Sequence, residues 1–322
     1  MKNAAALALA AASAVATTLP PTTQAAPTAV SAPAPVIQHR TIDVDGVQVF
    51  YREAGDPKRP TVLFLHGFPS SSQMYAGLMA RLADRYHVIA PDYPGSGHTI
   101  VGEKARFTPS FDGLAKVMEG FIRAKHLDRY ALYMQDFGGP VGFRLAVAHP
   151  ERVSALIVQN ANVYEEGLSD QIRDNIRRTS AGINPETQAI LDGITSRGSV
   201  QFMYTFGQRA PETVSPDSWT LAAGELEGEF NRHVQQSLLV DYHRNLAQYP
   251  DWQAYMKREQ PPTLVVWGKH DPLFVEAGAR AFARDLPKAE IQLLDTGHFA
   301  LEEDTPAVAE HMRRFLDALP QG

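Results

Sequence analysis

The sequence predicts an α/β protein with a doubly wound, mostly parallel sheet and a helical cap insertion. Short apolar runs, typical of strands buried on both faces, recur from residue 39 onward, and amphipathic helical patterns separate them. Strands that alternate with helices form parallel sheets covered on both faces. The alternation stops between about Asn162 and Pro261, where the periodicity is helical only. We therefore expect an α/β core at residues 39–161 and 262–322 and a helical cap at residues 162–261.

The composition limits the partners and cofactors. The 322 residues are 44% hydrophobic and 20% charged, which suffices for a sizeable core. The net charge is −6 and no long run of Lys or Arg occurs, so nucleic acid and anionic membranes are not expected partners. The chain has no cysteine, which excludes disulfides, thiolate metal sites and a catalytic thiol. It also has no dinucleotide fingerprint or phosphate loop, so we expect no metal and no organic cofactor.

The N-terminus is typical of an export signal. Lys2 precedes the apolar run AAALALAAASAVA, which is too short to span a bilayer, and no later stretch is long and apolar enough to do so. The following stretch is rich in Ala, Pro and Thr. We expect a signal peptide at residues 1–25, a flexible linker at residues 26–38 and a mature protein in the periplasm or medium. A disordered Ala/Pro tail is the alternative.

The expected strands begin with a hairpin and continue as buried runs. HRTIDVDGVQVFYREAG (39–55) predicts two short strands joined by a tight turn at Asp45–Gly46. The apolar runs that follow predict buried strands at TVLFLHG (61–67), HVIAPDYPG (87–95), RYALYMQD (129–136), VSALIVQNA (153–161), PTLVVWGK (262–269) and AEIQLLDTG (289–297). Two helices have clear signals: an apolar face in FDGLAKVMEGFIRAKHL, and Thr305 as a cap with Pro306 at the first helical position.

Polar residues follow several of these strands, at the edge where parallel sheets bind ligands. The motifs after the third, fifth, seventh and eighth expected strands are HGFP (66–69), QDFGGP (135–140), GKHDPLF (268–274) and GHFALEE (297–303). They supply Asp136, Asp271 and His298, in the order carboxylate, carboxylate, histidine. For Asp136 taken alone, a cap on the following helix is the structural alternative.

This constellation resembles the α/β-hydrolase fold superfamily, in the branch with an Asp nucleophile, over residues of about 40 to 320. The resemblance implies that Asp136 is the nucleophile on a strained strand–turn–helix elbow, where Gly138 and Gly139 let the helix pack closely. Met134 stands where this elbow usually has a glycine. No G-x-S-x-G motif occurs in the chain, which argues against a serine esterase.

The resemblance also assigns the other catalytic groups. His298 would be the general base, and Asp271 would orient its imidazole, as the acid of a triad does. In some relatives the acid follows the sixth strand instead, but that region offers Asn160 and Asn162, which carry no charge. The backbone N–H groups of Phe68 and Phe137 would stabilise the oxyanion.

An Asp nucleophile narrows the chemistry. Its attack on an electrophilic sp³ carbon gives an alkyl ester, which water activated by His298 hydrolyses. The sequence resembles two groups with this chemistry, epoxide hydrolases and haloalkane dehalogenases. Dehalogenases typically hold the halide with a Trp after the nucleophile, whereas Phe137 has no side-chain donor. HGFP is common in epoxide hydrolases, so we expect a hydrolase that opens epoxides to vicinal diols. A haloalkane dehalogenase with Trp219 as one halide donor is the alternative, and a catalytically inactive secreted binding protein is a third hypothesis.

In epoxide hydrolases two tyrosines of the cap polarise the epoxide oxygen. LLVDYHRNLAQYPDW resembles the segment that carries one of them and nominates Tyr242, with a purely structural tyrosine as the alternative. Tyr204 and Tyr164 are candidates for the second, and aromatic neighbours favour Tyr204.

Other residues complete the expected substrate site. We expect His66 to hold the loop that frames the site, and we expect Trp219 and Tyr164 to contact the substrate. His270 is expected to point aside from Asp271. The expected partners are a small apolar epoxide or halogenated substrate and water, while the oligomeric state is not predicted.

Overall fold

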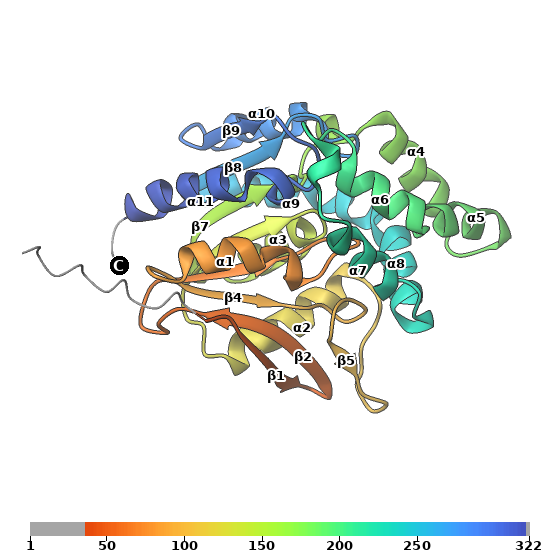
Figure 1. Cartoon of the computed structure of the whole chain (residues 1–322), viewed down its shortest axis with the longest axis horizontal. Coiled ribbons are helices and arrows are strands. Elements are labelled where there is room, and N and C mark those ends of the chain that lie inside the picture. Colours follow the sequence, from red (N-terminus) through yellow and green to blue (C-terminus); the bar gives the residue numbers. More distant parts are fainter. Residues whose placement is uncertain (1–35, 320–322) are drawn as a thin grey trace, which may run out of the picture. The chain divides into compact units, whose positions relative to one another are not determined.

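A mixed sheet with helices on both faces forms the core of the chain (Figure 1). The computed structural model describes residues 36–319. The strands in this part are β1 (Gln38–Val44), β2 (Val47–Ala54), β3 (Thr61–Leu65), β4 (His87–Pro91), β5 (Ile100–Val101), β6 (Tyr130–Gln135), β7 (Val153–Gln159), β8 (Thr263–Gly268) and β9 (Glu290–Leu294). The expected signal peptide, and the expected linker up to residue 35, lie outside the described residues.

The sheet is mostly parallel, which confirms the predicted fold class. Its order is β1-β2-β4-β3-β6-β7-β8-β9, with β5 paired to β2. The pairs from β4 through β3, β6, β7 and β8 to β9 are parallel, whereas β2 pairs antiparallel with β1, β4 and β5. All the expected strands are present. The additional strand, β5, has two residues, which is too short to produce a recognisable pattern.

Two apolar layers cover the sheet. One face packs against α1 (Ala76–Leu82) and α11 (Leu301–Asp317), and the other against α2 (Phe111–Ala124), α3 (Gly138–Ala148), α9 (His243–Glu259) and α10 (Glu276–Asp285). On β6, Leu132 and Met134 belong to one layer, and Ala131 and Tyr133 to the other. Burial on both faces explains why this strand is almost entirely apolar.

The last helix differs from its expected form. It begins at Leu301 rather than after Thr305, and it bends at Asp304, which has non-helical φ and ψ angles. The Thr305 hydroxyl donates a hydrogen bond to the Leu301 carbonyl, so Thr305 is not the cap. Pro306 has no N–H to continue the helical hydrogen bonding, which accounts for a bend just before it.

Helices alone occupy the chain between β7 and β8. They are α4 (Asp170–Thr179), α5 (Pro185–Ile194), α6 (Arg197–Thr205), α7 (Pro216–Glu225), α8 (Glu229–Asp241) and α9. In Figure 1, α4 to α8 gather at one end of the sheet. The last of the six, α9, instead packs on the core, where Trp252 stacks on Phe143 of α3. Among the helices of residues 36–319, none has the length and apolarity that a membrane span requires.

Polar side chains fasten the cap helices to core loops. Glu225 of α7 accepts hydrogen bonds from the Ser71 hydroxyl, at 3.2 Å, and from the Gly97 N–H, at 2.8 Å. Gln235 of α8 donates to the Gly95 carbonyl at 3.0 Å. These contacts hold α7 and α8 above the loops that follow β3 and β4.

The turn from β6 into α3 is closely packed against β3. Asp136 has a φ of 50°, in the left-handed region that favours glycine. A Cβ atom on Gly138 would lie 2.1 Å from the Leu65 carbonyl oxygen, and one on Gly67 would lie 2.3 Å from the Asp136 Cβ. Glycine at both positions therefore lets β3, the elbow and α3 approach one another.

We expect Gly138→Ala to destabilise the protein by more than about 2 kcal/mol, because the new methyl group meets a backbone carbonyl that cannot rotate away. Gly193→Ala is the matched control, since a Cβ there meets nothing within 4 Å. Gly193 lies in α5, and its replacement should raise stability by up to about 1 kcal/mol through helix propensity. Urea unfolding measures both. Equal stability of the two variants would contradict the tight packing of the elbow.

Candidate active site

Asp136 lies directly after β6 with its side chain buried. Its Oδ1 accepts a hydrogen bond from the Phe68 N–H at 2.7 Å, and the Phe137 N–H also bonds to the carboxylate. These are the two backbone donors expected from the sequence. They hold an oxygen of Asp136 itself, so they would face the oxyanion formed when an ester at Asp136 is hydrolysed.

The environment of Asp136 makes its carboxyl group a weaker acid. Burial raises its pKa to about 6, although the charge of His298 and the hydrogen bonds from the N–H groups of Phe68 and Phe137 favour the ionised form. At neutral pH the carboxylate is therefore still mostly ionised.

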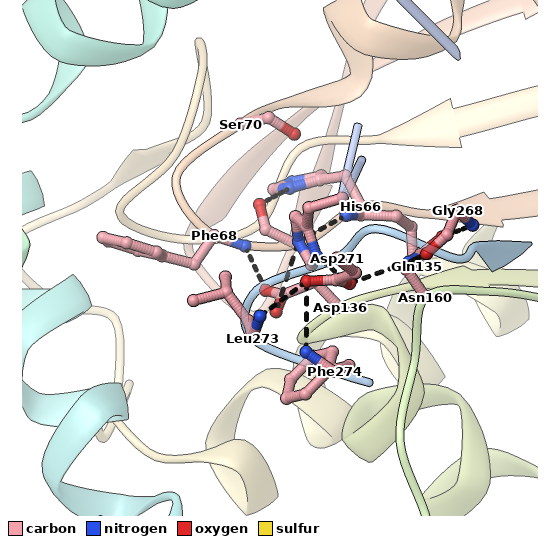
Figure 2. Close-up of polar contacts among 12 residues, drawn as sticks. His66, Phe68, Ser70, Gln135, Asp136, Asn160, Gly268, Asp271, Leu273 and Phe274 are labelled. Carbon is pink, nitrogen blue, oxygen red and sulfur yellow. Dashed lines mark hydrogen bonds and ion pairs between the residues drawn. The ribbon is translucent and has the colours of Figure 1, made fainter. Parts of the chain in front are cut away.

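His298 and Asp271 form a buried pair. Asp271 lies beside Asp136 in Figure 2. The His298 Nδ1 lies 2.7 Å from Asp271 Oδ2. The other carboxylate oxygen of Asp271 accepts hydrogen bonds from the N–H groups of Leu273, at 2.8 Å, and Phe274, at 3.1 Å. Asp271 thus accepts hydrogen bonds at both oxygens and orients the ring through Nδ1, as the acid of a triad would.

The other nitrogen of His298 faces two side chains. Its Nε2 lies 3.8 Å from Asp136 Oδ2, too far for a hydrogen bond, and 3.0 Å from Gln135 Nε2. Burial alone would lower the pKa of His298, but the charge and hydrogen bond of Asp271 and the charge of Asp136 outweigh it. The pKa therefore lies above its ordinary value.

Asn160 braces the triad acid, a role that sequence reasoning missed. Its Nδ2 donates to Asp271 Oδ2 at 2.7 Å, and its Oδ1 accepts from the Gly268 N–H at 3.0 Å. Its own carbonyl accepts a hydrogen bond from the Asp136 N–H at 3.2 Å. Asn160 carries no charge, so the sequence excludes it as the triad acid. Its bracing role could have been inferred from its position directly after β7, the strand next to the one that carries the elbow.

Asp136 opens onto a cavity of about 200 Å³ between core and cap. Phe68 and Phe137 line it next to the carboxylate, and α4, α6 and α8 provide much of its wall. Most of the wall is apolar, with side chains such as Ile172, Ile176, Met203, Leu239, Leu273 and Phe274. Within residues 36–319, no three His, Asp or Glu side chains are grouped as metal ligands would be.

Tyr242 lines this cavity together with Asp136. It stands at the junction of α8 and α9, and its ring centroid lies 5.9 Å from that of Phe137. Burial raises the pKa of Tyr242 well above its ordinary value. Among residues 36–319, its hydroxyl makes no well-aligned hydrogen bond, although a looser one with the Tyr249 hydroxyl contributes to its raised pKa. The sequence analysis did not identify Tyr249. Its position about two helical turns after Tyr242 could have indicated that the two tyrosines lie on the same side of a helix.

The two candidates for a second phenol lie outside the cavity lining. Tyr204 stacks on Phe299 with ring centroids 3.8 Å apart, and its hydroxyl interacts with Ser70. Tyr164 is buried, and its hydroxyl donates a hydrogen bond to Asp285 at 2.9 Å. The expectation that Tyr164 contacts the substrate is therefore corrected, because its ring and hydroxyl are engaged in core packing. Tyr204 likewise packs beside the triad loop and not at the cavity.

Trp219 lies away from the cavity, whereas His66 lies behind the loop that it was expected to hold. Trp219 lies under the Arg197 guanidinium, 5.1 Å from it, and does not line the cavity. His66 is buried behind the loop after β3, where its Nε2 accepts a hydrogen bond from the Tyr93 N–H at 3.2 Å. It braces the loop but does not reach the substrate cavity. His270 points aside from Asp271, as expected, and its Nε2 lies 2.8 Å from Asp295 Oδ1.

Comparison with known proteins agrees with this geometry. The model of the alpha/beta hydrolase fold family matches residues 60–305. The uncharacterized hydrolase YNR064C of Saccharomyces cerevisiae is 36% identical over 277 residues, which cover 85% of this chain and 95% of that protein. A cis-3-alkyl-4-alkyloxetan-2-one decarboxylase of Xanthomonas campestris is 26% identical over 293 residues, covering 85% of this chain and 94% of that protein.

Among solved structures, the haloalkane dehalogenase DbeA from Bradyrhizobium elkani superposes with a TM-score of 0.71 and 22% identity, covering 88% of this chain and all of that one. This likeness concerns the fold alone. The family model agrees with the mostly parallel sheet and its flanking helices. The chain belongs to the α/β hydrolase fold family.

Proposed function

We propose that this protein opens small apolar epoxides to vicinal diols through an alkyl ester on Asp136. The observation that carries the proposal is the buried Tyr242 hydroxyl, which shares the apolar cavity with Asp136 and, among residues 36–319, makes no well-aligned hydrogen bond. An epoxide oxygen stays on the substrate after ring opening and needs a proton, whereas a halide leaves as an anion. A phenol that lines the same cavity as the carboxylate therefore favours the epoxide.

In the first half-reaction, an oxygen of ionised Asp136 attacks a ring carbon, and the bond from that carbon to the ring oxygen breaks. The ring oxygen takes the phenolic proton of Tyr242. The products are an ester that carries a hydroxyl group and a phenolate at Tyr242. Because burial raises its pKa above the ordinary value, Tyr242 is protonated at neutral pH before the substrate binds.

In the second half-reaction, water gives a proton to Nε2 of His298 while its oxygen attacks the carboxyl carbon of Asp136. The N–H groups of Phe68 and Phe137 stabilise the oxyanion. When the intermediate collapses, the bond between this carbon and the substrate oxygen breaks, and the diol takes the proton from His298. The carboxyl proton of Asp136 then returns to the Tyr242 phenolate, which restores the starting state.

The electrostatics support this order of steps. The charge of Asp136 is one of the causes that raise the pKa of His298. Formation of the ester removes this charge, so the pKa of His298 falls. The imidazole thus becomes available as a base when an ester is present to be hydrolysed.

A haloalkane dehalogenase with the same triad is the alternative function. A departing halide needs side-chain donors, and Phe137 offers none, while Trp219 does not line the cavity. One relative, the cis-3-alkyl-4-alkyloxetan-2-one decarboxylase, is named for a substrate that, like an epoxide, is a strained ring containing oxygen. The cavity of about 200 Å³ is below the roughly 300–1,000 Å³ usual for drug-sized ligands, which favours small substrates.

The protonation state of Asp136 predicts the acid limb of the reaction. Since burial raises its pKa to about 6, the nucleophile is ionised above this pH and protonated below it. Ester formation should therefore slow about tenfold for each unit below pH 6, because a neutral carboxyl group is a poor nucleophile. Single-turnover quenching between pH 4.5 and 8 measures this rate. A rate independent of pH over this range would contradict the assignment.

Tyr242→Phe should slow epoxide opening about 10²-fold or more, because the ring oxygen loses its proton donor. The same variant should leave cleavage of a reactive haloalkane nearly unchanged if that side reaction is measurable. Tyr204→Phe is the matched control and should retain activity within about threefold, since Tyr204 does not line the cavity.

A panel of substrates tests the class of reaction on the wild-type protein. It should include styrene-type and aliphatic epoxides, short haloalkanes and a dialkyl oxetan-2-one. Faster turnover of the last two classes would assign the protein elsewhere.

His298→Gln should complete the first half-reaction and stall in the second. Intact mass should rise by the full mass of an epoxide, since no atom is lost on addition. A haloalkane would add its mass minus HX. Peptide mapping should locate the adduct on Asp136, and Asp136→Asn should give none. An adduct at another residue would overturn the mechanism, and no adduct with any substrate would favour the inactive binding protein.

A further inference from the structure

The cavity at Asp136 extends along one face of α4. The residues of this helix that line it are spaced at intervals of one turn, and they are Gln171, Ile172, Asn175, Ile176 and Thr179. Thr179 lies eight positions after Gln171. Since a helix rises about 1.5 Å per residue, the lining on α4 spans about 12 Å. The cavity is therefore long for its volume of about 200 Å³.

The inner end of the cavity lies at the edge of the sheet, where α4 begins. The Ser169 N–H, at the N-cap of α4, donates a hydrogen bond to the Leu273 carbonyl at 3.0 Å. Leu273 follows the triad acid by two residues and lines the cavity together with Asp136. The start of α4 is therefore the part of this helix that is joined to the catalytic side of the cavity.

The outer end lies in the cap. α6 ends near the catalytic histidine, because Tyr204, close to its C-terminus, stacks on Phe299. α6 thus approaches the catalytic side with its last turn, whereas α4 does so with its first. The lining residues at the opposite ends, where α4 and α5 finish and α6 starts, are Thr179, Ile194 and Ser199.

The lining is neutral, and its outer end has no need of a polar ligand. Among the lining residues of the described chain, Asp136 alone carries a charge. The hydroxyls of Thr179 and Ser199 donate to backbone carbonyls of α4 and α5, at 2.9 and 2.7 Å. Gln171 donates a hydrogen bond to Asn175 at 3.0 Å. A charged group at the outer end would lose its hydration without gaining a partner, so this end suits a methyl terminus.

The volume of the cavity limits the width of what it holds. A volume of about 200 Å³ has room for about seven groups of the size of a water molecule, at roughly 30 Å³ each. A methylene group has a similar size. Seven such groups over a length of about 12 Å form a slim column. A straight alkyl chain has this shape, whereas a branched chain needs more width at one point.

We propose that the cavity selects neutral terminal epoxides with one unbranched alkyl chain, and that Thr179 limits the length of this chain. The ring lies at Asp136 and the chain runs along α4 towards the outer end. This proposal rests on the proposed function, because it names the class of epoxide that the same site binds. In a terminal epoxide all the apolar volume belongs to one chain, which matches a cavity with one long axis.

A series from 1,2-epoxypropane to 1,2-epoxydecane tests the fit. The value of kcat/KM should rise about fourfold with each CH₂ group that enters the cavity. The rise should continue to about seven heavy atoms, as in 1,2-epoxyhexane, and then level off or reverse. 1,2-Epoxyheptane should react at least about tenfold faster than its isomer 1,2-epoxy-4,4-dimethylpentane, because the branched chain overfills the cavity.

Thr179→Met places a longer side chain at the outer end. It should lower the ratio of kcat/KM for 1,2-epoxyhexane to that for 1,2-epoxypropane at least about tenfold. Thr205→Met is the matched control. Thr205 is also the last residue of a cap helix, and its hydroxyl donates to the carbonyl four residues earlier, but it does not line the cavity. This control should leave the ratio unchanged. Ile194→Ala should shift the preference to longer chains, and it provides the test should Thr179→Met not fold.

A second measurement separates this proposal from the proposed function. Thermal stabilisation by 1,2-alkanediols of increasing length follows binding without turnover. If epoxides are opened but chain length, branching and Thr179→Met have no effect on the preference, the chain selectivity is overturned and the proposed function stands. Equal shifts in Thr179→Met and Thr205→Met would also overturn it. If longer diols stabilise the protein more but no epoxide is opened, the proposed function fails and the role of the cavity stands. If neither occurs, both fail.

Discussion

Asp136 occupies a left-handed backbone conformation, and the chain around it is arranged to accommodate this turn. Its φ of 50° is strained for a residue with a side chain. Glycine at Gly67 and Gly138 lets the loop after β3 and the start of α3 approach the turn, where a Cβ atom would collide. The same close approach brings the Phe68 N–H to 2.7 Å from the carboxylate. One strained residue thus sets the position of the nucleophile and of its oxyanion donors together.

Two carboxylates flank one imidazole, and their surroundings give them different tasks. The oxygens of Asp271 accept hydrogen bonds from His298, Asn160, Leu273 and Phe274. Asp136 has two backbone donors and a raised pKa, and it faces the cavity. The well-bonded carboxylate is a fixed partner for His298, whereas the poorly solvated one is available to react. Removing the charge of Asp136 would lower the pKa of His298, because both groups are buried and screening is weak there.

The cap combines polar attachment with an apolar interior. Glu225 and Gln235 bond to core loops at its margin, while the cavity wall from α4, α6 and α8 is mostly apolar. Burial raises the pKa of Glu225 to about 7. An apolar cavity limits the approach of bulk water to an ester on Asp136. In the proposed mechanism, hydrolysis then depends on water that His298 can activate.

Local pattern was enough to predict the strands, the elbow at Asp136 and the pairing of Asp271 with His298, because each strand end meets the same edge of the sheet. It was not enough for Tyr164 and Trp219, whose directions depend on packing between segments far apart in the chain. Gln135 and Gln159 make the reason clear. Both are buried amides at the ends of adjacent apolar strands, paired in register. One contacts the catalytic histidine and the other a core tyrosine, and only the three-dimensional fold distinguishes them.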